Sequence, residues 1–530
     1  MEILGTEPEP SSRSPNGDDD QAPQGTGLSR RASLNAAAAG LDFGARTVIE
    51  LVLNPLMLHG LGDYLFGAWR ILWRLTGYLW ATSGRAAQAL QSAVANRLQS
   101  EDTDEKKRFV GASVVVWALY SPLLAVAVGL AMWKLPGLLD APSGLVSDLR
   151  WTILLLGVDA IVLSLFTIPR ATLQGENLGY RRMGLSTVLV IVSGLLTGGA
   201  LWLDLGIVGV ATVNLLATVY TGAVFWRIAR VHVRWFGAAR PRAREVRWFF
   251  GLSSWFMLWK LVNQLMMSGD VLVLGILGSV ELVTTYALTK FIPEATLPLL
   301  AMLVMGGIPG LGGIIGAGEH ARARRVRGDV LSFTWLFGVA FAVSILLWNE
   351  SFVRMWVGEE YFAGRTELLL LMISLLQLAL IRSDALIIDT TLNVGAKTLA
   401  GLGSAVLALV IAGVLIGRYD MGIAGLCVGL IVGRAILNAV YPALVGAAID
   451  HPFREQLRSA FRPFVTTGGL LTTATLASPL IAVDSWPLLV AGSAATAIAT
   501  LTVAFRVGLD GPTRRRIVKR ARLMTGRAPS

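Results

Sequence analysis

The side chains of this sequence that are best suited to chemistry are ionisable residues inside long apolar stretches. Residues 248–294 form two apolar runs joined by a short polar turn, and they contain Lys260, Asp270, Lys290 and Glu294. An ionisable side chain at the centre of a bilayer costs at least about 2.5–3.5 kcal/mol. These residues therefore need partners, water or a function, and their grouping makes this stretch the first candidate for a site.

The composition indicates that most of the chain lies in a membrane. Of its 530 residues, 54% are apolar and 15% are charged, whereas an ordinary soluble domain carries about 25% charged residues. Residues 1–33 are polar and rich in Pro, Gly, Ser and Asp, which predicts a disordered tail without a secretory signal. The first apolar stretch is therefore expected to remain in the mature protein.

The sulfur and imidazole groups do not suggest a metal centre. The single cysteine, Cys427, lies in an apolar run, which favours a small core residue and excludes an intrachain disulfide. The four histidines are far apart in the sequence, which argues against a zinc or haem site. We expect no cofactor, and the small ions that we consider are a coupling H⁺ or Na⁺.

Each helical crossing of a bilayer needs about 20 mainly apolar residues. Apolar stretches of about this length occur about fourteen times, so the sequence predicts an all-α integral membrane protein with about fourteen transmembrane helices. The predicted spans are 34–57, 65–86, 109–133, 149–171, 184–203, 207–228, 248–272, 284–311, 329–350, 366–389, 398–417, 422–446, 462–483 and 486–508.

Arginine and lysine are concentrated in alternate loops between these spans. The predicted inner loops include 97–108, 227–247 and 322–327, while the predicted outer loops hold few basic residues. This pattern follows the positive-inside rule and predicts that both termini are cytoplasmic. Because the basic clusters are explained by topology, we expect no nucleic-acid partner. Residues 85–100 place apolar side chains on one helical face, which predicts an interfacial helix.

A shift of 216 residues brings related positions of the chain into register. Gly206 falls on Gly422, and Arg74 in the second span falls on Lys290 in the eighth. Two repeats with an even number of spans run in the same direction and are related by an axis along the membrane normal, a layout found in transporters. A duplicated bundle that serves as a scaffold is the alternative.

The repeat and the spans together predict the domain organisation. The predicted parts are a disordered cytoplasmic tail at 1–33, an N-terminal six-helix lobe at 34–228, a basic cytoplasmic connector at 229–247, a C-terminal six-helix lobe at 248–446, an extra helix pair at 447–508 and a basic cytoplasmic tail at 509–530.

Several segments resemble one family of transporters. They read LNPLMLHGLGDYLFGAW at 53–69, ATLQGENLGYRRMG at 171–184, GGIIGAGEHARARRVR at 312–327 and NESFVRMWVGEEYFAG at 349–364. The chain resembles the polysaccharide-transporter, or O-antigen flippase-like, branch of the multidrug/oligosaccharidyl-lipid/polysaccharide exporter (MOP) superfamily over about residues 34–510.

The resemblance implies a fold and a function. It implies two six-helix lobes that face each other as a V, as in MATE transporters, with the first, second, seventh and eighth helices lining the cleft. It also implies a flippase that moves a polyprenyl-diphosphate-linked oligosaccharide from the inner to the outer leaflet of the cell membrane by alternating access. The cargo would serve surface polysaccharide biosynthesis, either lipopolysaccharide or exopolysaccharide. A polysaccharide polymerase and glycosyltransferases would be partners beside the membrane lipid.

Cations on the helices that would line the cleft are the candidates for binding a diphosphate, because buried cations pair with phosphate oxygens. Arg382 and Arg434 are further intramembrane cations. Structural pairing is the alternative, since residues spaced four apart share a helical face. The substrate-binding candidates are Arg46, Arg70, Arg74, Lys260 and Lys290.

Carboxylates in the apolar stretches are the candidates for ion coupling, because a buried carboxylate can exchange a proton during transport. Charge compensation of the same arginines is the alternative. The ion-coupling candidates are Asp42, Glu50, Asp270 and Glu294, and Asp159 is a further carboxylate that could bind the coupling ion. Repeated prolines and glycines between Pro293 and Gly313 predict that the eighth span is broken.

Other functions remain open from the sequence. An ion-coupled exporter of drugs or small metabolites would have the same fold. A membrane glycan polymerase or ligase is less expected, because such enzymes carry a large outer loop with catalytic residues and the longest outer loops here, at 134–148 and 351–365, are short. A scaffold that recruits envelope-building enzymes through its tails is a further alternative. We therefore predict a transporter and not an enzyme.

Overall fold

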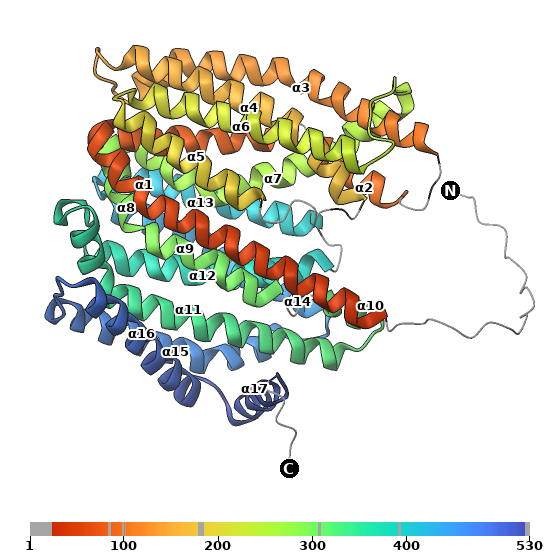
Figure 1. Cartoon of the computed structure of the whole chain (residues 1–530). Helices are drawn as coiled ribbons and strands as arrows, with labels where there is room; N and C mark the ends of the chain where they lie inside the picture. Colours follow the sequence, from red (N-terminus) through yellow and green to blue (C-terminus); the bar gives the residue numbers. More distant parts are fainter. Residues whose placement is uncertain are drawn as a thin grey trace, which may run out of the picture.

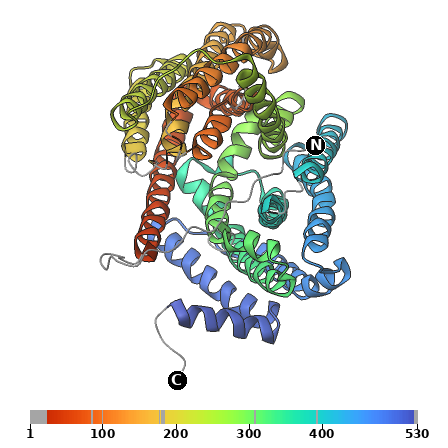
Figure 2. The same ribbon diagram turned by 90° about the vertical axis from the view of Figure 1, so that its right-hand side faces the viewer.

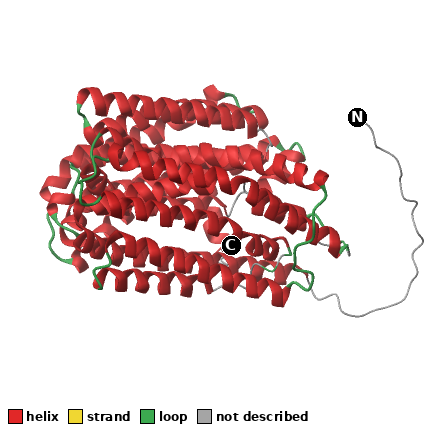
Figure 3. Cartoon of the chain, turned by 90° about the horizontal axis from the view of Figure 1, so that it is seen from above, coloured by secondary structure: helices red, strands yellow, loops and turns green. Residues whose placement is uncertain are grey.

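The computed structural model describes residues 24–82, 86–97, 100, 102–176, 178, 185–305, 309–390 and 394–524. All regular structure in these ranges is helical, and the helices lie roughly parallel to one another (Figures 1 and 3). Nine of the described helices are long and apolar enough to cross a membrane. The predicted class, an all-α multi-pass membrane protein, is confirmed, while the number of fourteen crossings stays a prediction.

The helices form two groups and a C-terminal addition, seen from one end in Figure 2. The first group is α1 (Gln24–Thr82), α2 (Ala86–Ala95), α3 (Thr103–Leu138), α4 (Val146–Gly175), α5 (Leu185–Trp202) and α6 (Gly206–His232). The second group is α7 (Ala243–Leu277), α8 (Val280–Thr289), α9 (Phe291–Met305), α10 (Pro309–Gly316), α11 (His320–Trp356), η2 (Glu359–Tyr361), α12 (Arg365–Thr390), α13 (Val394–Tyr419) and α14 (Gly422–Ala448). The C-terminal helices are α15 (Phe453–Ala477), η3 (Ser478–Leu480), α16 (Trp486–Val503), η4 (Ala504–Gly508) and α17 (Gly511–Met524).

Helix α1 contains the first two predicted spans as one hairpin that turns at Gly62. Gly62 has φ 76° and ψ 170°, a conformation that is open essentially only to glycine. Arg70 donates a hydrogen bond to Asn54 across the turn (Nη2 to Oδ1, 2.6 Å). The predicted loop between these spans is therefore replaced by a single residue. We call the end of the bundle at this turn the Gly62 end and the other end, where α2 and α10 lie in Figure 1, the α2 end.

The eighth predicted span is broken, as its prolines and glycines suggested. Helix α8 ends at Thr289 and α9 begins at Phe291, and Pro293 has no N–H to donate to the carbonyl four residues earlier. That carbonyl, on Thr289, instead accepts a hydrogen bond from Asn349 Nδ2 on α11 (3.1 Å). Residues 306–308 include Gly306 and Gly307, two of the glycines from which the break was predicted, and lie outside the described residues.

Helix α2 is the helix predicted over residues 85–100, but its apolar face packs on protein and not on lipid. Ala89, Leu90 and Val94 are buried against α3, α4 and α7. The connector beside it is also packed, because Ala239 N–H donates to the Lys107 carbonyl (3.1 Å). The connector is therefore attached to the first helix group.

The predicted repeat extends to backbone conformation. Asp204 and Asp420, which are 216 residues apart, both have positive φ (51° and 53°), as do Gly206 (59°) and Gly422 (47°). Each pair forms the turn that leads into α6 or α14. Equivalent helix pairs in the two halves are thus joined by the same strained turn.

Replacing Gly62 with alanine should destabilise the α1 hairpin. No neighbour would meet the new Cβ within 4 Å, so the cost is backbone strain of about 1–3 kcal/mol. Thermal denaturation of the purified protein in detergent measures it. Gly199→Ala is the control, because that position is also open but helical. Equal melting of the two variants would contradict the strained turn.

Candidate functional site

A cavity of about 220 Å³ lies inside the second helix group and against α1. Leucines of α9, α12 and α14 form the apolar part of its wall, and each of these helices also contributes one charged side chain. The lining residues are Arg74, Met267, Asp270, Tyr286, Lys290, Glu294, Leu297, Pro298, Leu371, Ser374, Leu375, Leu378, Arg382, Leu430 and Arg434. A narrower gap continues from Leu297 and Arg382 between α9 and α12.

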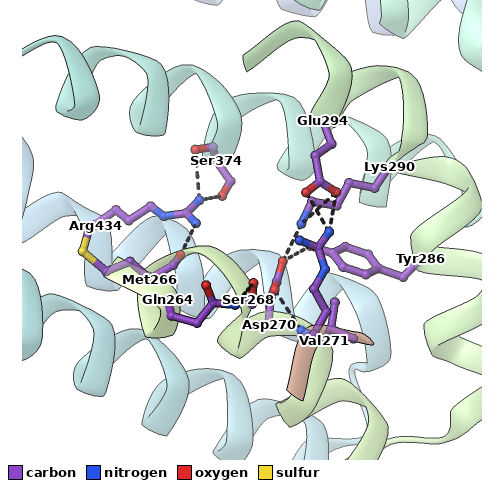
Figure 4. A network of polar contacts seen from close by, with 11 residues as sticks. Gln264, Met266, Ser268, Asp270, Val271, Tyr286, Lys290, Glu294, Ser374 and Arg434 are labelled. Carbon is purple, nitrogen blue, oxygen red and sulfur yellow. Dashed lines mark hydrogen bonds and ion pairs between the residues drawn. The ribbon is translucent and has the colours of Figure 1, made fainter. Parts of the chain in front are cut away.

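One side of the cavity is a buried ionic network, shown in Figure 4. Lys290 Nζ lies 2.5 Å from Asp270 Oδ2, and the Tyr286 hydroxyl donates to the same oxygen (2.7 Å). Backbone N–H of Val271 donates to the other oxygen (2.9 Å). The Lys290 and Asp270 side chains are almost fully buried, so each compensates a charge that would be very costly alone.

The network continues across the boundary between the two helix groups. Arg74 Nη2 on α1 lies 2.7 and 2.8 Å from the two carboxylate oxygens of Glu294 on α9. Glu294 is also 4.0 Å from Lys290 Nζ. We call Arg74, Asp270, Tyr286, Lys290 and Glu294 the central charge cluster.

One hydrogen bond of the central charge cluster has a counterpart in the first half of the chain, 216 residues earlier. Asn54 and Arg70 of the first half correspond to Asp270 and Tyr286 of the second. In each half the second residue donates a hydrogen bond to the first, at 2.6 and 2.7 Å. These pairs were not recognised from the sequence, although the offset that relates Arg74 to Lys290 relates them too. Both halves therefore brace a helix pair with the same polar contact.

The cavity also holds two guanidinium groups that pair with no carboxylate among the described residues. Arg434 donates to the carbonyl and hydroxyl of Ser374 and to the Met266 carbonyl. Arg382 is exposed and lines both the cavity and its narrow extension, and no described residue forms a hydrogen bond or ion pair with it. Both arginines were identified from the sequence as intramembrane cations but were not among the predicted substrate-binding residues. The resemblance does not imply that the helices that carry them, α12 and α14, line the cleft.

The other predicted cations lie away from this cavity. Arg46 forms an exposed ion pair with Asp42 one turn away (3.0 Å). Arg70 donates a hydrogen bond to Asn54, and its guanidinium carbon lies over the Phe66 ring, 5.0 Å from the ring centroid. Lys260 is ten residues before Asp270 on α7, roughly 15 Å along the helix, and it has interactions of its own.

Two carboxylates differ from the paired ones. Glu50 is exposed and lies within electrostatic range of Arg70, Arg74 and Glu294, without a direct ion pair among the described residues. Asp159 is fully buried between α4 and α6, beside Asn214 and Thr218. Groups of three or more potential metal ligands do not occur in the part of the chain that the structure describes.

The two helix groups are tied together at the Gly62 end. The Tyr361 hydroxyl on η2 donates to Asp63 Oδ1 (2.5 Å), Thr284 on α8 donates to the Asp63 carbonyl (2.7 Å), and Trp356 donates to the Leu51 carbonyl (2.8 Å). The hydrogen bond to Asp63, with some burial, raises the pKa of Tyr361 to about 12. Gly67 allows the close approach, because a Cβ there would lie 2.2 Å from the Val280 carbonyl oxygen.

Comparisons with known proteins show what this arrangement resembles. No protein-family model and no curated protein sequence matches the chain. Among solved structures, lipid II flippase MurJ in an inward closed conformation matches with a TM-score of 0.64 at 12% identity, over 89% of this chain and 99% of that chain. The chain has the fold of this flippase.

Multidrug transporters share this fold. A multidrug resistance MATE family transporter in an inward-facing conformation matches with a TM-score of 0.56 at 14% identity, over 76% of this chain and 94% of that chain. The Vibrio cholerae MATE transporter VcmN matches with a TM-score of 0.51 at 18% identity, over 81% and 98%. At these identities the likeness establishes the fold, which is the expected MATE-like one, and leaves the cargo open.

Removing one member of the buried pair should cost more than removing both. Asp270→Asn leaves the Lys290 charge without its nearest counter-charge and should lower the free energy of unfolding by about 3–5 kcal/mol. The double variant Asp270→Asn/Lys290→Met should recover most of this, as measured by thermal denaturation. Glu350→Gln, which breaks an exposed pair with Arg365, should cost less than about 1 kcal/mol. Additive losses in the double variant would refute the coupling.

Tyr361→Phe should loosen the Gly62 end. A hydrogen bond to a charged group contributes about 1.5–3 kcal/mol, so its loss should raise the population open at that end roughly tenfold or more. Distances measured by electron paramagnetic resonance between spin labels at positions 203 and 418 would report this opening. Tyr220→Phe is the control, because Tyr220 is exposed on α6. An unchanged distance distribution in Tyr361→Phe would show that the contact does not hold the ends together.

Proposed function

We propose that this chain is a membrane transporter that moves a polyprenyl-diphosphate-linked oligosaccharide between leaflets by alternating access. The observation that carries the proposal is the charge of the cavity. Its lining holds four cationic side chains and two carboxylates, so two positive charges are left for a ligand. Guanidinium groups bind phosphate oxygens with strong, often bidentate hydrogen bonds.

In this proposal Arg382 and Arg434 are the primary diphosphate ligands. Both lack a carboxylate partner among the described residues, and Arg382 is exposed to the cavity. Arg74 and Lys290 are secondary ligands, since each must first exchange a carboxylate for phosphate. The remaining predicted ligands, Arg46, Arg70 and Lys260, would meet the cargo only in another conformation.

Alternating access requires the two helix groups to separate at one end at a time. The contacts of Tyr361 and Trp356 close the Gly62 end, and Arg74–Glu294 is a contact between the groups at mid-depth. We propose that lobes at 34–228 and 248–446 rock about this mid-depth contact, with both termini on the cytoplasmic side of the cell membrane.

Among the four predicted coupling carboxylates, Glu50 is free of a direct ion pair with any described residue and is the proposed site for H⁺ or Na⁺.

An ion-coupled exporter of small molecules is the second candidate, because multidrug MATE transporters share the fold. The cavity charge separates the two candidates. An uncompensated cationic lining attracts anions and repels organic cations by Coulomb's law.

If the cargo is a surface polysaccharide unit, a polysaccharide polymerase and glycosyltransferases are the expected partners.

Lipid-linked intermediates in cells test the proposal. Cells that lack the protein should accumulate a complete but unpolymerised polyprenyl-diphosphate glycan, identified by mass spectrometry after lipid extraction. Wild type should clear this pool. Arg382→Gln should clear it roughly ten- to a hundred-fold more slowly, which corresponds to one lost hydrogen-bonded charge contact.

The matched control is Arg418→Gln, which removes an exposed arginine at the Gly62 end of α13. It should behave as wild type. An unchanged lipid pool with normal surface glycan in cells without the protein would exclude the flippase and favour export of small molecules.

A further inference from the structure

The first turns of α15 carry two adjacent exposed faces of different chemistry. Phe453, Leu457, Phe461 and Phe464 recur at intervals of four, four and three residues and lie on one side of the helix, whereas Arg454, Arg458 and Arg462 recur every four residues on the next side. All seven side chains are exposed. Phe461 is 68% and Phe464 is 76% exposed, so no described part of the chain covers them.

A buried network fixes the direction in which these faces point. Gln456, on the opposite side of α15, accepts a hydrogen bond from Arg327 on α11 (2.8 Å) and donates to the carbonyls of His451 and Pro442 (2.8 and 3.1 Å). Arg327 is held in turn by two 2.8 Å contacts with Asp384 on α12. The start of α15 is therefore rigidly attached, and its phenylalanines and arginines are turned away from the bundle.

Further basic residues gather at the same end. Arg462 Nε donates to the carbonyl of Val507 in η4 (2.5 Å), which joins α15 to the segment that leads into α17. Helix α17 is anchored on α11 by Arg516, whose Nε lies 3.4 Å from Asp329, and by the buried Ile517. Its Arg515 stays exposed. Within residues 453–464 the one acidic side chain is Glu455, so the exposed surface is strongly positive.

We propose that the start of α15, with Arg515 of α17, binds an anionic phospholipid of the surrounding leaflet. The chemistry matches both parts of such a lipid: arginines pair with the phosphate headgroup, and the neighbouring phenylalanine face contacts the acyl chains. Arg454 and Arg462 are eight residues apart, roughly 12 Å along the helix. The site is distinct from the cavity and does not depend on which cargo the protein moves.

The test uses the purified full-length protein in detergent, titrated with phosphatidylglycerol or phosphatidylcholine and analysed by native mass spectrometry. Wild type should retain phosphatidylglycerol preferentially. Each basic side chain near an anionic lipid surface contributes about a fivefold factor, so Arg454→Gln/Arg458→Gln/Arg462→Gln should weaken phosphatidylglycerol binding by roughly 100-fold. The triple replacement by lysine should keep most of the binding.

The control is Arg234→Gln/Arg240→Gln/Arg244→Gln, which removes three exposed arginines from the connector and has the same effect on net charge. It should bind phosphatidylglycerol as wild type does. Equal loss in both triple variants, or equal retention of the two lipids by wild type, would overturn the proposal. Displacement of phosphatidylglycerol by an equal concentration of inorganic phosphate would also overturn it, because the site would then take a free anion and not a lipid.

Discussion

The structure depends on the compensation of charge at the depth of the membrane. Lys290 and Asp270 lie 2.5 Å apart and almost fully buried, and each would be prohibitively costly without the other. Their contact fixes α7 against the junction of α8 and α9, and Arg74–Glu294 extends the ionic network onto α1. This network therefore joins the two helix groups through a direct ion pair.

The repeat explains why the network lies where it does. Positions 54, 70 and 74 of the first half correspond to 270, 286 and 290 of the second. In the first half Asn54 holds Arg70, while in the second Asp270 holds Tyr286 and Lys290. The two halves therefore share a bracing geometry but differ in charge. This asymmetry places the buried carboxylate in the second half, where the cavity lies.

The sequence predicted what depends on local pattern. Apolar length predicted the helical membrane class, the prolines after Lys290 predicted the broken eighth span, and Arg74, Lys290 and Glu294 were among the predicted site residues. Lys290 and Glu294 are four residues apart and share a helical face, but their charged atoms are 4.0 Å apart and Asp270 lies much closer to Lys290. Contacts between helices depend on how the helices cross, which residue spacing within one helix does not report.

The same limit explains why Arg382 and Arg434 were not placed in the cavity beforehand. Each is a lone cation in an apolar helix, and the direction that it faces is set by the packing of α12 and α14. The hairpin turn at Gly62 was also missed, because one residue with φ 76° replaces an expected loop. Conversely, the apolar face of α2 was assigned to lipid because the sequence does not show that α3, α4 and α7 cover it.

The most direct test of a cationic cavity is the affinity of the purified protein for three lipids with the same chain: a polyprenyl diphosphate, the monophosphate and the free alcohol. The charge of the lining predicts that affinity falls in that order, that the preference for diphosphate weakens in Arg382→Gln, and that it decreases as salt screens the contact. Equal affinity for the diphosphate and the alcohol would show that the cavity does not recognise phosphate, and the central claim would then be wrong.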